Sequence, residues 1–77
     1  MPTIIKVKGF RFYFYSNDHE PIHIHVEKSG AKAKVQIDPA ISLIENKGFS
    51  PRAIKQILAL CEEAQELIID AWEAFHD

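Results

Sequence analysis

Alternation of apolar and polar residues along the first 38 positions is the feature that most limits how this chain can fold. The segment FRFYFYS (10–16) places its three phenylalanines on one side and Arg11, Tyr13 and Tyr15 on the other. The segments IHIHVEK (22–28) and AKAKVQID (31–38) repeat the alternation, and TIIKVK (3–8) is rich in β-branched residues. This period of two is typical of a sheet with one buried and one solvated face.

The connections between these segments favour hairpins. Gly9 suits a tight first turn, NDHEP (17–21) forms a longer loop, and Ser29 with Gly30 suits a short hairpin turn. The sequence therefore predicts a four-stranded antiparallel meander over about residues 3–38, which Pro39 ends.

The second part of the chain has a helical pattern. Ser50 can cap a helix whose first position is Pro51. An apolar stripe with spacings of three and four then predicts one long helix over about 51–76. Its members are Ile54, Ile57, Leu58, Cys61, Ala64, Ile68, Ala71 and Phe75. The preceding segment AISLIENKGF (40–49) is ambiguous, and a short helix closed by Gly48 is one interpretation.

These elements predict a single α+β domain, residues 1–77, with the long helix packed on one face of the sheet. The apolar sheet face expected under the helix comprises Phe10, Phe12, Phe14, Ile22, Ile24, Val26, Val35 and Ile37. The single cysteine, Cys61, and a start without a leader-like apolar run indicate a cytoplasmic protein with no membrane partner. Homodimerisation would add buried area to so small a domain.

Charge is distributed unevenly although the net charge is only −2. Residues 1–39 sum to +2, and residues 40–77 sum to −4. The sheet face opposite the helix carries most of the basic residues, interleaved with tyrosines, which is the composition of a surface for single-stranded RNA. A protein partner or an ordinary solvated face are alternatives. The expected members are Lys6, Lys8, Arg11, Tyr13, Tyr15, His23, His25, Glu27, Lys32, Lys34 and Gln36.

Three of the four histidines fall in SNDHEPIHIHVEK (16–28), and they have three competing interpretations. His23 and His25 share one strand face and, with His19, would make a three-ligand zinc site; no other cofactor is expected. Alternatively, His23 or His25 would perform metal-independent acid–base cleavage of RNA together with Tyr13, Tyr15 and Arg11. The third interpretation is structural, with the histidines pairing across strands with tyrosines.

Three stretches of the chain carry a family resemblance. They are MPTIIKVKGFRFYFYSNDHEPIHIHVEK, NKGFSPRAIKQI and the closing AWEAF. Together they resemble a bacterial family catalogued as domain of unknown function 4160 (DUF4160), although Ile22 stands where many members have a second proline. The resemblance implies a small protein partner encoded in a paired, toxin–antitoxin-like gene arrangement, and it brings no catalytic residues. The leading hypothesis is thus an interaction module that acts through the polar sheet face.

Overall fold

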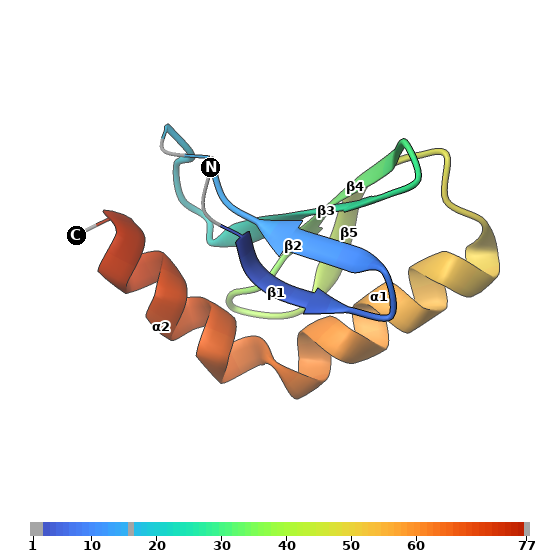
Figure 1. Ribbon diagram of the computed structural model, residues 1–77. Coiled ribbons are helices and arrows are strands. Elements are labelled where there is room, and N and C mark those ends of the chain that lie inside the picture. Colours follow the sequence, from blue (N-terminus) through green and yellow to red (C-terminus); the bar gives the residue numbers. More distant parts are fainter. Residues whose placement is uncertain (1–2, 16, 77) are drawn as a thin grey trace.

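A computed structural model describes residues 3–15 and 17–76 of the chain (Figure 1). Ser16, within the predicted strand 10–16, lies outside the described residues. The strands are β1 (Thr3–Val7), β2 (Phe10–Tyr13), β3 (His23–Lys28), β4 (Ala31–Gln36) and β5 (Ser42–Lys47). The helices are α1 (Pro51–Glu63) and α2 (Gln65–His76). The α+β class predicted from the sequence is confirmed.

The five strands form one antiparallel sheet in the order β1-β2-β3-β4-β5, so each strand pairs with its neighbours in sequence. Two of the hairpin turns have positive φ at both central residues, Lys8 with Gly9 and Ser29 with Gly30. This geometry twists in the same sense as the flanking strands and is the usual one for two-residue hairpins. The meander and both predicted turns are therefore confirmed.

The prediction of four strands was wrong, because residues 42–47 form β5 rather than a short helix. Lys34 lies opposite Glu45 and Val35 lies opposite Leu43, which leaves Ile44 as an extra residue in the edge strand. Such a bulge places two apolar residues in succession and interrupts the period of two. The alternation that revealed the other strands is therefore hidden here.

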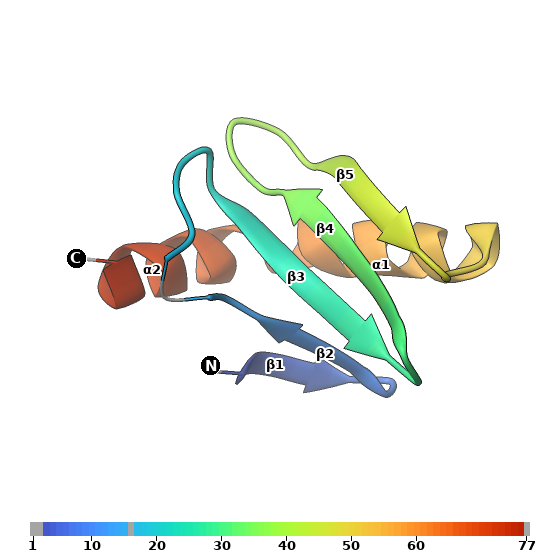
Figure 2. The same cartoon turned by 90° about the horizontal axis from the view of Figure 1, so that it is seen from above.

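The prediction of one long helix was also wrong, because the helical segment is divided at Ala64. Ala64 ends α1 with a backbone far from helical ψ (φ −103°, ψ 12°). The next side chain, Gln65, donates a hydrogen bond from Nε2 to the carbonyl of Ile37 at 2.8 Å. The chain thus changes direction at a point anchored to the end of β4, and both helices lie under the same face of the sheet (Figures 1 and 2).

The core lies between that sheet face and the two helices. All eight apolar sheet residues predicted to face the helix are buried, and Ile57, Cys61, Ile68 and Trp72 meet them from the helices. Burial raises the pKa of the Cys61 thiol to about 12, as expected for a core residue rather than a nucleophile. At the end of α2 the buried residue of the apolar stripe is Trp72, whereas Phe75 is 37% exposed. Neither described helix is long and apolar enough to cross a membrane.

Candidate functional site

The loop between β2 and β3 folds back over the polar face of the sheet and brings Asp18 to the histidines of β3. The loop is fastened at its base, where the Tyr15 amide donates to Asp18 Oδ2 at 2.9 Å and the Asp18 amide donates to the Tyr15 carbonyl at 3.2 Å. Aspartate favours such local turns because its side chain accepts from nearby backbone amides. His23 and His25 are two residues apart on β3 and therefore share one face.

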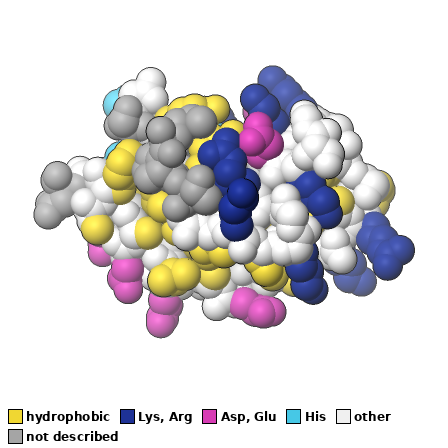
Figure 3. Space-filling model, in the orientation of Figure 1, with side chains coloured by type: hydrophobic (Ala, Val, Ile, Leu, Met, Phe, Trp, Pro, Cys, Tyr) yellow, Lys and Arg dark blue, Asp and Glu magenta, His cyan; other side chains and the backbone are white. Residues whose placement is uncertain are grey.

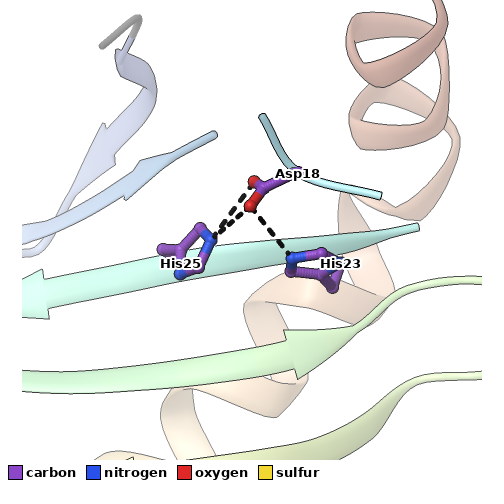
Figure 4. A group of neighbouring side chains, drawn as sticks. All are labelled: Asp18, His23 and His25. Carbon is purple, nitrogen blue, oxygen red and sulfur yellow. Dashed lines mark hydrogen bonds and ion pairs between the residues drawn. The ribbon is translucent and has the colours of Figure 1, made fainter. Parts of the chain in front are cut away.

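Asp18, His23 and His25 form one compact cluster, which we call the Asp–His cluster (Figure 4). Asp18 Oδ1 lies 3.3 Å from His23 Nε2 and 3.2 Å from His25 Nε2. His25 Nε2 is also 3.2 Å from Asp18 Oδ2. One ligand atom from each of the three residues can be chosen so that all lie within 4.8 Å of one another. A carboxylate and two imidazole nitrogens therefore converge on one point.

The Asp–His cluster is largely covered, with side chains only 10–13% exposed. Burial lowers the pKa of His25, and the neighbouring Asp18 carboxylate offsets this only in part. Burial acts to raise the pKa of Asp18, but hydrogen bonds from the Tyr15 amide and from His25 outweigh it and leave that pKa lowered. At neutral pH the cluster therefore holds an ionised carboxylate beside a neutral His25.

His23 is oriented by a second hydrogen bond on the far side of its ring. Its Nδ1 lies 2.9 Å from the carbonyl of Pro21, which can only accept, so Nδ1 carries the proton. In a neutral His23 ring the lone pair is then on Nε2 and faces Asp18 Oδ1. Two acceptors 3.3 Å apart repel unless a proton or a metal cation lies between them. Metal-binding histidines are oriented in this way by a donor bond from the other ring nitrogen.

Aromatic rings enclose His25. Tyr13 stacks on its ring at 5.4 Å between centroids, and Tyr15 meets it edge-on at 4.5 Å. Tyr13 is only 2% exposed, although the sequence placed it on the solvated face. Burial and the neighbouring Tyr15 hydroxyl raise the pKa of Tyr13, so its hydroxyl stays protonated across the physiological range. These ring contacts fix the plane of His25.

Arg11, which was predicted to stabilise charge in RNA cleavage, is engaged in structural contacts. Its guanidinium donates to Glu27 Oε1 from Nη2 at 2.9 Å and from Nε at 3.2 Å. The same guanidinium lies over the Tyr13 ring at 4.3 Å. The structure therefore brings Arg11, Tyr13, Tyr15 and His25 together, as predicted, but ties the arginine to a carboxylate.

A row of charged residues crosses the whole polar face of the sheet, one from each strand. The register pairs Lys6 with Arg11, Arg11 with Glu27, Glu27 with Lys32, and Lys32 with Lys47. Four cations thus accompany one carboxylate in what we call the basic row. Lys and Arg side chains lie over the sheet and where α1 begins, whereas Asp and Glu lie mainly along the helix side (Figure 3).

His23 and His25 lie on one strand face, as the sequence predicted, but part of their surroundings was not predicted. His19, predicted as the third zinc ligand, is exposed, and Asp18 rather than His19 lies beside His23 and His25. The sequence places Asp18 only within the loop 17–21. Its position five residues before His23, in a loop that returns over the strand, was the one available signal. Lys47 was missed because β5 was not recognised.

Comparison with protein families identifies the class of this chain. Residues 9–73 match the family described as Domain of unknown function (DUF4160). The chain belongs to that family, as its sequence motifs suggested. Searches among curated proteins and among solved structures found no match.

Proposed function

We propose that this protein binds a divalent transition-metal ion of the zinc class through Asp18, His23 and His25. The observation that carries the proposal is the convergence of His23 Nε2 and His25 Nε2 on Asp18 Oδ1 at 3.3 and 3.2 Å. In a tetrahedral site with bonds of about 2.0–2.1 Å, neighbouring ligand atoms lie about 3.3 Å apart. The two nitrogen–oxygen distances thus match edges of a zinc tetrahedron, and all three ligand atoms lie within 4.8 Å of one another.

The donor chemistry supports the same ion. Imidazole nitrogen suits zinc and its first-row neighbours, whereas magnesium and calcium prefer sites made wholly of oxygen. His25 is neutral and Asp18 ionised at neutral pH, so binding requires no net loss of a proton, only a shift of the His25 proton from Nε2 to Nδ1. The Pro21 carbonyl holds the His23 ring with Nε2 directed into the cluster. Three protein ligands leave a fourth position for a small ligand, which is the arrangement of catalytic rather than structural zinc sites.

A zinc titration against a chromophoric chelator tests the proposal. The wild-type chain should withdraw one equivalent of zinc, and His23→Gln and Asp18→Asn should each weaken binding by more than about 100-fold, beyond the effect of losing a second-shell partner. His19→Gln is the matched control, because it removes the exposed histidine of the same loop and should leave binding unchanged. Loss of binding in His19→Gln but not in Asp18→Asn would favour the original trio of histidines and contradict the proposal.

The interaction role in a toxin–antitoxin-like pair and the metal-independent nuclease activity stay predictions. For the nuclease, the contact between Arg11 and Glu27 and the raised pKa of Tyr13 reduce the groups ready for acid–base chemistry. For a protein partner, Leu43 and Ile44 on the edge strand β5 are exposed apolar contact points. The metal site is favoured over both because all three of its ligands are already aligned.

A further inference from the structure

Beside the Asp–His cluster, the polar sheet face contains a pocket of about 210 Å³ between β2, β3, β4 and β5. His25, which belongs to the Asp–His cluster, forms one side of the pocket together with Tyr15. Lys32 and Lys34 from β4 and Lys47 from β5 line the rest, together with Glu45. Three lysines against one carboxylate leave a net charge of +2 around this hollow.

The lysines of this pocket are available to a ligand. Lys47 approaches Glu45 only loosely, with Nζ 3.7 Å from Oε2, and both side chains are well exposed. Among the described residues, Lys32 and Lys34 have no ion-pair or hydrogen-bond partner. Exposed pairs of this kind contribute little, so an anion can replace the contact at small cost. The pocket therefore concentrates positive charge that the fold itself does not neutralise.

The volume of the pocket limits what can occupy it. About 210 Å³ is space for roughly seven water molecules, since each takes about 30 Å³. Pockets for whole drug-sized ligands are larger, at about 300–1,000 Å³. A phosphate group with part of its hydration shell fits, whereas a complete nucleotide would extend out of the pocket.

The basic row supplies the path along which a longer ligand would continue. From Lys47 and Lys32 at the pocket, the row runs through the ion pair of Glu27 and Arg11 to Lys6 at the opposite edge of the sheet. With strands about 4.8 Å apart, its five positions cover about 19 Å, which is long enough for several consecutive phosphates. We propose that this pocket binds a phosphate of a single-stranded nucleic acid whose backbone follows the basic row. This inference does not depend on metal binding at the Asp–His cluster.

The test is fluorescence anisotropy with a labelled twelve-nucleotide oligouridylate, carried out in EDTA so that the metal site has no influence. Each phosphate of a single strand that a protein neutralises releases about 0.7 counterions. If three phosphates are neutralised, the association constant should therefore fall about 20-fold between 50 and 200 mM salt. Lys32→Gln and Lys34→Gln should each weaken binding about 8-fold at 50 mM salt. Each should also reduce the slope of log association constant against log salt concentration by about 0.7. Unchanged melting temperatures would show that both variants fold.

Lys55→Gln is the matched control, because it makes the same charge change on the exposed side of α1, away from the polar sheet face. It should leave binding unchanged. An equal loss of affinity in Lys55→Gln would mean that the oligonucleotide is attracted diffusely, and it would contradict binding at the pocket. No binding at 50 mM salt would overturn the inference outright. Polyglutamate and unlabelled oligouridylate should also be compared as competitors at equal concentrations of negative charge. If polyglutamate displaces the labelled oligonucleotide equally well, the surface binds acidic proteins and the inference is contradicted.

Discussion

Zinc should raise the thermal stability of this protein by an amount that follows from its size. A ligand that binds only the folded state at 100 times its dissociation constant stabilises that state by about 2.7 kcal/mol. For 77 residues the entropy of unfolding is about 0.16 kcal/mol/K, at roughly 2.1 cal/mol/K per residue. Dividing the two gives an increase in melting temperature of about 17 °C.

Asp18→Asn should remove most of this increase. The variant keeps the shape of the side chain and can still accept from the Tyr15 amide, but it loses the anionic oxygen between His23 and His25. If zinc affinity falls 100-fold, the same zinc concentration equals the dissociation constant and contributes only about 0.4 kcal/mol. The expected increase is then about 3 °C.

Circular dichroism melts with buffered free zinc and with EDTA measure both numbers. His19→Gln should behave as the wild type, which separates binding at the Asp–His cluster from binding by histidines in general. An increase of similar size in the wild type and in Asp18→Asn would contradict this prediction, since the carboxylate would then not be a ligand. An unchanged melting temperature in wild-type protein at saturating zinc would refute it as well.

Two further predictions concern the protein without metal. The pKa values of His25 and Asp18 are both lowered by folding, so the unfolded chain binds more protons at these sites as the pH falls. The free energy of unfolding in EDTA should therefore decrease as the pH falls below 6.5, because of His25, and decrease further below pH 3.8, because of Asp18. Urea unfolding measures this free energy, and between about pH 7.5 and 5.5 its decrease should be smaller in His25→Gln than in the wild type. In α2, Ile68→Ala should lower the free energy of unfolding by about 2–5 kcal/mol, because Ile68 is fully buried. Leu67→Ala changes a neighbouring side chain that is 56% exposed, and it should alter that free energy by no more than about 0.5 kcal/mol.

The parts of the fold that could be predicted are those where one physical rule acts alone. Alternation predicted β2, β3 and β4 and the buried face that includes Phe12, Ile24 and Val35, because one face of the sheet packs on the helices and the other does not. The β5 strand could not be predicted because the bulge at Ile44 breaks the alternation. The division of the helix at Ala64 involves neither proline nor glycine, and it follows from tertiary contact of Gln65 with Ile37.

The candidate site was predicted in part for a similar reason. His23 and His25 could be placed on one face from strand periodicity alone. The third member depends on how a loop returns over the sheet, and loop geometry is set by contacts such as that of Asp18 with the Tyr15 amide, which spacing does not reveal. Tyr13 was expected to face solvent, and it is instead covered by Arg11, Tyr15 and His25. Polar faces of small sheets can thus bury aromatic rings among their own side chains.

X-ray absorption spectroscopy of the zinc-loaded protein would identify the atoms that bind the metal. We expect one zinc per chain with a shell of four nitrogen or oxygen atoms at about 2.0–2.1 Å, and the outer-shell scattering of two imidazole rings. In Asp18→Asn and His23→Gln this signature should be lost or reduced. A shell of six oxygens without imidazole scattering, or a sulfur ligand at about 2.3 Å, would contradict a metal site at Asp18, His23 and His25.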